Sequence, residues 1–485
     1  MQNRSRAGIG LLLAVALSAA ARLWLLLDRP LWFDELFTLW VSRLPLRDLV
    51  AALRSDSGPP GFYVFEKPLL LLSGTCADAA PLARVVPFLA ALGLFAAART
   101  LPRGIARATL VLLLSTSVLV NLYAAEARPY ALLALLNLLL FLLALRGAET
   151  PPRTAALVGL AALALYTHYL AVIAVAALLV LCALERRWRS CAALAAGGAV
   201  FLPWLPILRT QPVESIAWMR ETSAGSIGGF LSALGGVGRV PASFGAGPAP
   251  ALGLAGLVAG VILLALVGAH ARSDRDARNA AGFVLLVLGG ALFAGLWRPI
   301  AFAGRTEMAV LPVWMWAVSR STPASRATRL AAGASIALGM IATAGFLRAP
   351  HGEPRASAVA STLARVARPG DVVVAAASFY LPARLAAECG DLTAAVRPLP
   401  EELGRHPGWF VPALPGPSEE KVLEQALDEA RGEGRVFLAI PPVYATPALL
   451  RLLDSPGGPA RALLQTPDAL ILLRAPDPGS HAPRP

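Results

Sequence analysis

The stretch ALGLAGLVAGVILLALVGA, residues 251–269, contains no charged side chain. A helix needs about 20 mostly apolar residues to cross the hydrocarbon core of a bilayer, so this stretch predicts a transmembrane helix. Similar runs fill most of the first 348 positions, and the chain is 56% hydrophobic and only 15% charged. That composition is too apolar for an ordinary soluble protein. The chain is therefore predicted to be an integral membrane protein whose main solvent is the bilayer.

About eleven segments are predicted to cross the membrane. The first, residues 7–27, is long for a signal peptide and lacks a convincing small-residue cleavage site. In contrast, residues 61–73 are interrupted by Glu66, Lys67 and Pro68 and are predicted not to cross. The other predicted crossings are residues 85–98, 108–122, 130–145, 155–166, 170–184, 192–208, 251–269, 281–296, 308–318 and 330–346.

The arginines between these segments predict the orientation. Alternate threading places five groups of them on one side: 99, 103 and 107; 146 and 153; 186, 187 and 189; 272, 275 and 278; and 320, 326 and 329. By the positive-inside rule that side is the cytoplasm, with the N-terminus on it. The net charge of +13 is thus explained by membrane-flanking loops, and no nucleic-acid partner is predicted.

Beyond residue 348 the sequence changes character. Short apolar strands at 371–376, 435–440 and 469–473 alternate with helical patterns at 381–388 and 418–431. The predicted architecture is a polytopic α-helical membrane protein with interfacial helices and a small C-terminal extracytoplasmic α/β domain. Its predicted parts are a transmembrane domain, 1–348, with a first outer loop at 28–84, an α/β domain, 349–475, and a disordered tail, 476–485.

Ionisable residues beside apolar segments are expensive in a membrane and are therefore candidates for function. The first candidates are Asp34 and Glu35, an acidic pair just beyond the first helix. The pair could supply a general base and a metal or hydrogen-bond ligand. Alternatively, Asp34 could cap a short interfacial helix anchored by its aromatic neighbours.

The remaining candidates lie in three further outer-face segments of the predicted topology. Arg128 could bind a phosphate and Glu126 could orient it or bind a metal, although a loop salt bridge would explain both. His168 between two apolar runs could be catalytic or a packing residue. Arg305, followed by Glu307, could make a second phosphate contact or extend its charge to the interface. Together these residues suggest a site for an anionic, lipid-borne substrate.

Several ordered motifs resemble the GT-C superfamily of membrane glycosyltransferases, in the family of protein O-mannosyltransferases and ArnT-like aminoarabinose transferases. They are Asp34-Glu35, SGPPGFY at 57–63, YAAEARPY at 123–130, YTHY at 166–169 and LPWLP at 202–206. The motifs match well over residues 7–208, whereas beyond residue 208 only the order of the predicted segments is similar. The chain departs from the family pattern at Gly58, where His is common, and at Thr306, where Tyr is common.

The resemblance implies a polyprenyl-phosphate-sugar donor, with Asp34 as general base and Glu35 as its support. It implies that Glu126 and Arg128 lie near the donor phosphate, with Tyr130, His168 and Arg305 as further candidates for donor binding, and a divalent metal could assist at Glu35 or Glu126. No nucleotide cofactor is expected, because the energy for transfer is already stored in the sugar-phosphate bond.

The expected activity is inverting transfer of a hexosyl or pentosyl group, on the extracytoplasmic face of the cell membrane, to a lipid, glycan or protein acceptor. A transporter or flippase for a lipid-linked saccharide is the main alternative, and a non-catalytic envelope assembly protein is another. Charges concentrated on one membrane face, instead of along a path across it, favour the transferase.

Overall fold

A computed structural model describes residues 2–73, 76–147, 150–216, 219, 224–240, 249–349, 355–407, 417–430, 434–453, 460–467 and 469–474. The predicted tail, 476–485, lies outside these residues. By internal contacts the chain divides into two units that interleave in sequence. The membrane unit comprises Met1–Arg29, Ser57–Leu69 and Pro81–Gly352, and the second unit comprises Pro30–Asp56, Leu70–Ala80 and Glu353–Pro485.

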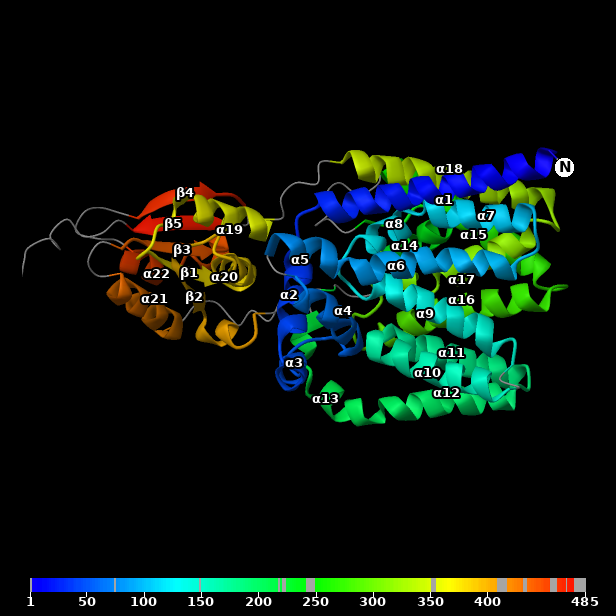
Figure 1. Ribbon diagram of the computed structural model, residues 1–485, viewed down its shortest axis with the longest axis horizontal. Helices are drawn as coiled ribbons and strands as arrows, with labels where there is room; N and C mark the ends of the chain where they lie inside the picture. The colour runs from blue at the N-terminus through cyan, green and yellow to red at the C-terminus, as the bar shows by residue number, and fades with distance from the viewer. Residues whose placement is uncertain are drawn as a thin grey trace, which may run out of the picture. The chain divides into compact units, whose positions relative to one another are not determined.

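Helices make up the membrane unit (Figure 1), and α10, α11 and α12 pack against one another within it. All eleven ranges predicted to cross coincide with a helix or a run of consecutive helices. The helices of this unit, including α14, which no predicted crossing covers, have the following bounds: α1 Gln2–Asp28, α6 Val85–Gly93 with η1 Leu94–Thr100, α7 Ile105–Thr116, α8 Val118–Ala124, α9 Tyr130–Ala144, α10 Pro151–Thr167, α11 Leu170–Leu184, α12 Trp188–Phe201 with η2 Leu202–Trp204 and α13 Leu205–Thr210, α14 Ala224–Leu234, α15 Pro250–His270, α16 Arg275–Ala294, α17 Leu311–Ser321 and α18 Arg326–Arg348.

Length and composition identify the described helices that can span a bilayer. Six qualify, or seven if the bent pair α7 and α8 counts as one span, and α9 and α11 are shorter apolar helices. The predicted multi-pass membrane fold is therefore confirmed. The interrupted segment forms α4, Gly61–Leu71, with Pro68 inside it. Eleven helical residues extend about 16 Å, roughly half the thickness of the hydrocarbon core, which agrees with a segment that does not cross.

A buried arginine supports the 61° bend between α7 and α8. Arg22 of α1 has no exposed surface, and its Nη2 donates to the carbonyl of Leu114, which the bend leaves without a helical partner. Its Nε donates to Oδ1 of Asn121 on α8 at 2.9 Å. Ser117 caps the new helix by accepting the Val120 N–H. The first helix therefore stabilises the bend that precedes the loop carrying Glu126 and Arg128.

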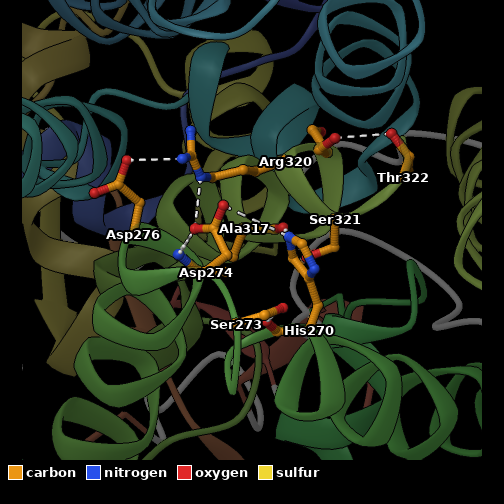
Figure 2. A network of polar contacts seen from close by, with 10 residues as sticks. His270, Ser273, Asp274, Asp276, Ala317, Arg320, Ser321 and Thr322 are labelled. Carbon is orange, nitrogen blue, oxygen red and sulfur yellow. Dashed lines mark hydrogen bonds and ion pairs between the residues drawn. The ribbon is translucent and has the colours of Figure 1, made fainter. Parts of the chain in front are cut away.

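An ion-pair network joins one end of α15, α16 and α17 (Figure 2). Arg320 donates to Asp274 at 2.8 Å and to Asp276 at 3.0 Å, and His270 lies 3.7 Å from Asp274. Burial alone would raise the pKa of Asp274, but the hydrogen bonds from Arg320 and from the Ala277 N–H bring it below its usual value. A second pairing links Glu185, at the end of α11, to Arg275 and Arg278. These arginines belong to the groups predicted to share one side of the membrane, and they meet at one end of the helices.

Close backbone approach between α14 and α15 depends on glycine. A Cβ at Gly260 would clash with the carbonyl of Leu231, whereas a Cβ at Gly268 on the same helix would meet open space. We expect Gly260→Ala to destabilise the membrane unit by about 1–3 kcal/mol, because a backbone carbonyl has to move. Thermal unfolding in detergent measures this, with Gly268→Ala as the matched control. Equal unfolding temperatures for the two variants would show that α14 and α15 accommodate the added methyl group without loss of stability.

The second unit contains a five-stranded sheet of order β2-β1-β3-β5-β4. Strand β1, Val372–Ala376, pairs in parallel with β2, Ala395–Leu399, and β3, Val436–Ile440. Strand β5, Leu470–Arg474, is antiparallel to β3 and to β4, Arg461–Gln465. The predicted α/β fold is therefore confirmed, with β2 and β4 as additional strands.

Helices cover both faces of this sheet (Figure 1). Alternate strand residues point to opposite faces, so Val373 packs with α19, Arg355–Val366, and α20, Tyr380–Glu388. Val374 packs on the other face with α21, Pro417–Glu429, and α22, Pro447–Leu453. Two helices from the first loop, α2 (Phe33–Arg43) and α3 (Leu46–Leu53), also belong to this unit. Cys389 in this unit is disulfide-bonded, whereas Cys182 and Cys191 are free.

Candidate functional site

A turn between α8 and α9 presents Glu126 and Arg128. The Arg128 N–H donates to the carbonyl of Glu126 at 2.7 Å, and Pro129 precedes the first residue of α9, as predicted. Glu126 has no exposed surface, and Arg128 is half-buried. A carboxylate and a guanidinium are thus held within one short turn of the membrane unit.

Tyr130 lies at the centre of a buried cluster in the membrane unit. Its ring centroid is 4.7 Å from that of Tyr123 and 5.3 Å from that of His168, and Cζ of Arg305 lies 5.8 Å from it. The structure therefore brings together three of the predicted site residues, Tyr130, His168 and Arg305. Tyr123, which belongs to the motif at 123–130, joins them and donates from its hydroxyl to the carbonyl of Gly304 at 2.6 Å.

His168 lies between α10 and α11, outside both helices. Its Nδ1 accepts the N–H of Leu170 at 3.1 Å, which assigns the proton of the neutral ring to Nε2. Burial, and then the positive charges of Arg128 and Arg305, lower the pKa of His168 to about 3. The imidazole is therefore neutral at physiological pH and can donate one hydrogen bond through Nε2.

Arg305 is held by a tight loop before α17. Both carboxylate oxygens of Glu307 accept the N–H of Gly304, at 2.9 and 2.8 Å, and the Thr306 hydroxyl accepts the N–H of Phe302 at 2.9 Å. Gly304 has φ +96°, and a Cβ there would clash with the carbonyl of Arg239. Thr306, the residue that departs from the family pattern, thus has a structural role in the loop.

The guanidinium of Arg305 lies in an aromatic environment. Arg305 is only 7% exposed, and its Cζ lies 5.5 Å from the ring centroid of Phe302 as well as beside Tyr130. Glu307 is fully buried, and burial raises its pKa to about 7, although the Gly304 N–H and the charge of Arg239 act in the opposite direction. The cluster therefore combines a buried cation with aromatic faces and a neutral histidine.

The acidic pair occupies the first turn of α2 in the second unit. The Glu35 carboxylate accepts the N–H of Trp32 at 3.3 Å, so Glu35 caps the start of the helix. Asp34 is 4% exposed, and its backbone carbonyl accepts the hydroxyl of Thr38. A cap at the start of this helix is thus made by Glu35, the neighbour of Asp34.

Glu66 lies on α4 and interrupts an apolar run. Its side chain has no exposed surface, and neither carboxylate oxygen has a hydrogen-bond partner among the residues that the structure describes. Buried carboxylates are normally paired or hydrogen-bonded. The signal that could have identified it was its position, next to Lys67 inside apolar sequence.

The described residues show no ready cluster of ligands for the divalent metal that could assist the reaction. Within the described ranges, no three or more His, Cys, Asp or Glu side chains come close enough to hold an ion. The carboxylate of Glu35, one of the two suggested ligands, is engaged with the Trp32 N–H. We therefore derive no step through a metal.

Known proteins resemble this chain in fold. No protein-family model matches the sequence, and no curated protein does. Among solved structures, ArnT from Cupriavidus metallidurans in the apo state has a TM-score of 0.60 at 14% identity, covering 99% of this chain and 100% of that one. The same protein bound to undecaprenyl phosphate has a TM-score of 0.58 at 14% identity, over 98% and 99% of the two chains.

A more distant likeness is to the archaeal oligosaccharyltransferase AglB from Archaeoglobus fulgidus, in complex with an inhibitory peptide and a dolichol-phosphate. It has a TM-score of 0.51 at 12% identity, covering 88% of this chain and 69% of that one. The fold that the motifs led us to expect is thus confirmed: over nearly its whole length, the chain has a fold similar to those of ArnT and AglB.

Proposed function

We propose that this chain is a glycosyltransferase that moves a sugar from a polyprenyl-phosphate donor to an envelope acceptor on the extracytoplasmic face of the membrane. The observation that carries the proposal is the cluster of the buried Arg305 and Tyr130 with the half-buried His168 in the membrane unit. The planar guanidinium of arginine can donate two parallel hydrogen bonds to phosphate oxygens, and aromatic rings can pack against a sugar ring or a lipid chain. The comparison structures contain undecaprenyl phosphate and dolichol-phosphate, and such lipid phosphates would suit this cluster.

In the proposed reaction, Asp34 accepts a proton from the acceptor hydroxyl or amine as that group attacks the anomeric carbon of the donor sugar. The new bond forms between the acceptor atom and the anomeric carbon, with inversion. The bond from that carbon to the phosphate oxygen breaks, and its electron pair leaves with the polyprenyl phosphate. Arg128 and Arg305 would stabilise the charge that develops on the phosphate.

Arg305→Gln tests the phosphate contact. A charge-assisted hydrogen bond contributes about 1.5–3 kcal/mol, so we expect kcat/KM for the donor to fall by about 10- to 150-fold. Arg305→Lys should retain part of the activity, because lysine keeps the positive charge but cannot donate two parallel hydrogen bonds to the phosphate. The assay is transfer of radiolabelled sugar from polyprenyl-phosphate donors to envelope acceptors by purified protein in liposomes.

Arg298→Gln is the matched control, since Arg298 is an exposed arginine in the same connection between α16 and α17. Normal kinetics in Arg305→Gln would remove Arg305 from the donor site. Absence of transfer by the wild type, together with movement of the lipid-linked sugar across the vesicle membrane, would replace the transferase with a transporter.

A further inference from the structure

Helix α2 is too short to be stable alone. It has eleven residues, Phe33–Arg43, and isolated helices below about 12–15 residues are marginal in water. All its residues from Phe33 to Ser42 are nevertheless buried in the folded chain. Its position and the directions of its side chains must therefore depend on the elements packed against it.

Two elements of the C-terminal α/β part contact this helix region. Helix α20 packs against α2. At the entry to α2, the Ser357 hydroxyl on α19 donates to the carbonyl of Leu31 at 2.9 Å. The start of the helix and one of its sides are thus held by residues more than 300 positions away in the sequence.

A third contact comes from His406, which follows the short helix η7, Glu401–Gly404. Its ring centroid lies 5.5 Å from that of Phe37 at 58° and 6.1 Å from that of Trp40 at 89°. Tilted and edge-to-face pairs at these distances are favourable, at about 0.5–1.5 kcal/mol each. The imidazole therefore packs against two aromatic rings that lie one and two turns beyond Asp34.

The segment that carries His406 is itself fixed. Nη1 of Arg384 on α20 donates to the carbonyl of Gly404 at 3.4 Å, and its Nε pairs with Glu388 at 2.8 Å. Burial lowers the pKa of His406, although the nearby Asp56 carboxylate and the backbone at Ala52 act in the opposite direction. The ring can thus remain neutral while it packs against Phe37 and Trp40.

We propose that His406 is a positioning residue: by packing on Phe37 and Trp40, it fixes the rotation of α2 and hence the direction of the Asp34 carboxylate. Phe37 follows Asp34 by three residues, so the two side chains lie on neighbouring parts of one helix face. The proposal rests on the function proposed above and gives the α/β part a specific task, to hold the helix that carries the base.

Small rotations of the helix matter for chemistry. A carboxylate about 5 Å from the axis moves by about 1 Å when the helix turns by about 12°. A misplacement of that size can cost about 100-fold in rate. Loss of the His406 ring should therefore reduce kcat without changing how the donor binds.

The test compares the full-length wild type with His406→Ala, His406→Phe and the control Arg405→Ala, an exposed neighbour in the same segment. Transfer kinetics in liposomes and hydrogen exchange of the α2 amides are both measured. We expect His406→Ala to lower kcat by about 10- to 100-fold with an unchanged donor KM, and to speed exchange across residues 33–43. His406→Phe should restore both, because it restores the ring, and Arg405→Ala should match the wild type.

Ser357→Ala removes a single hydrogen bond and provides a second test if His406→Ala does not fold. It should speed exchange at the first turn of α2 and lower kcat modestly. Unchanged kcat in His406→Ala, or a lower kcat with unchanged α2 exchange, would overturn the proposal. If the wild type transfers no sugar, the proposed function fails, whereas faster α2 exchange in His406→Ala would still show that His406 holds the helix.

Discussion

Asp34→Asn is expected to reduce sugar transfer by about 100- to 10,000-fold, the range associated with loss of a general base. Asparagine is nearly isosteric with aspartate, so α2 should fold as before, but the amide cannot accept the acceptor proton. Donor binding should be retained, because phosphate recognition is assigned to arginines of the membrane unit. The change should therefore appear in kcat, measured with purified protein in liposomes.

Two variants make this result specific. Asp48→Asn removes an exposed carboxylate on the neighbouring helix α3 and should be neutral. Glu35→Gln keeps an oxygen that can accept the Trp32 N–H, so it should retain much of the activity if Glu35 only caps the helix. Full transfer by Asp34→Asn would refute the assignment of the base.

Asp371→Asn is expected to have the largest effect on folding of the α/β part. Asp371 is 3% exposed and accepts hydrogen bonds from the backbone N–H groups of Arg368 and Arg435, at 2.7 and 2.8 Å. Its ion pair with Arg435 measures 2.7 Å. Breaking a buried pair costs about 3–5 kcal/mol, and the lower end applies here because the Arg435 side chain is 23% exposed. Hydrogen exchange of β1 and β3 in the full-length protein would measure the loss.

The same contacts predict a pH dependence. Burial alone would raise the pKa of Asp371, but the hydrogen bonds from Arg435 and Arg368 hold it below 3.8. The stabilisation is therefore present above pH 3.8 and is lost as the pH falls through the lowered pKa. The difference between wild type and variant should shrink below about pH 4. Glu429→Gln, which breaks the exposed pair with Arg397, should cost at most about 1 kcal/mol, and an equal loss in both variants would contradict the argument.

Much of the fold could be predicted because local pattern determines it. The eleven apolar ranges are helical, and the central strands β1 and β3 read as short, fully apolar runs. The edge strands were missed for a physical reason: β2 contains Arg397 and Pro398, and β4 is largely exposed, so neither has a buried-strand pattern. The association of α2 with the α/β part depends on contacts across more than 300 residues, which no local pattern contains.

The candidate site was predicted in part. His168 and Arg305 were predicted because polar groups beside apolar runs are costly in a membrane, and Tyr130 because it belongs to the motif at 123–130; the structure brings the three together. Tyr123 was missed because a tyrosine at the end of an apolar helix is typical of a membrane interface. Glu66 could not be predicted because, beside Lys67 and Pro68, it has the pattern of a break in an apolar helix, and its burial depends on tertiary packing.

The interleaving of the two units has a consequence for biosynthesis. Residues 30–56 leave the ribosome early, but their packing partners in the α/β part begin only at residue 353. At a synthesis rate of about 5–20 residues per second, this helical segment waits about 15–60 s for those partners. During that interval the apolar face of α2 is uncovered, so the nascent chain should be most vulnerable to proteases and most dependent on chaperones until the last quarter of the chain has been translated.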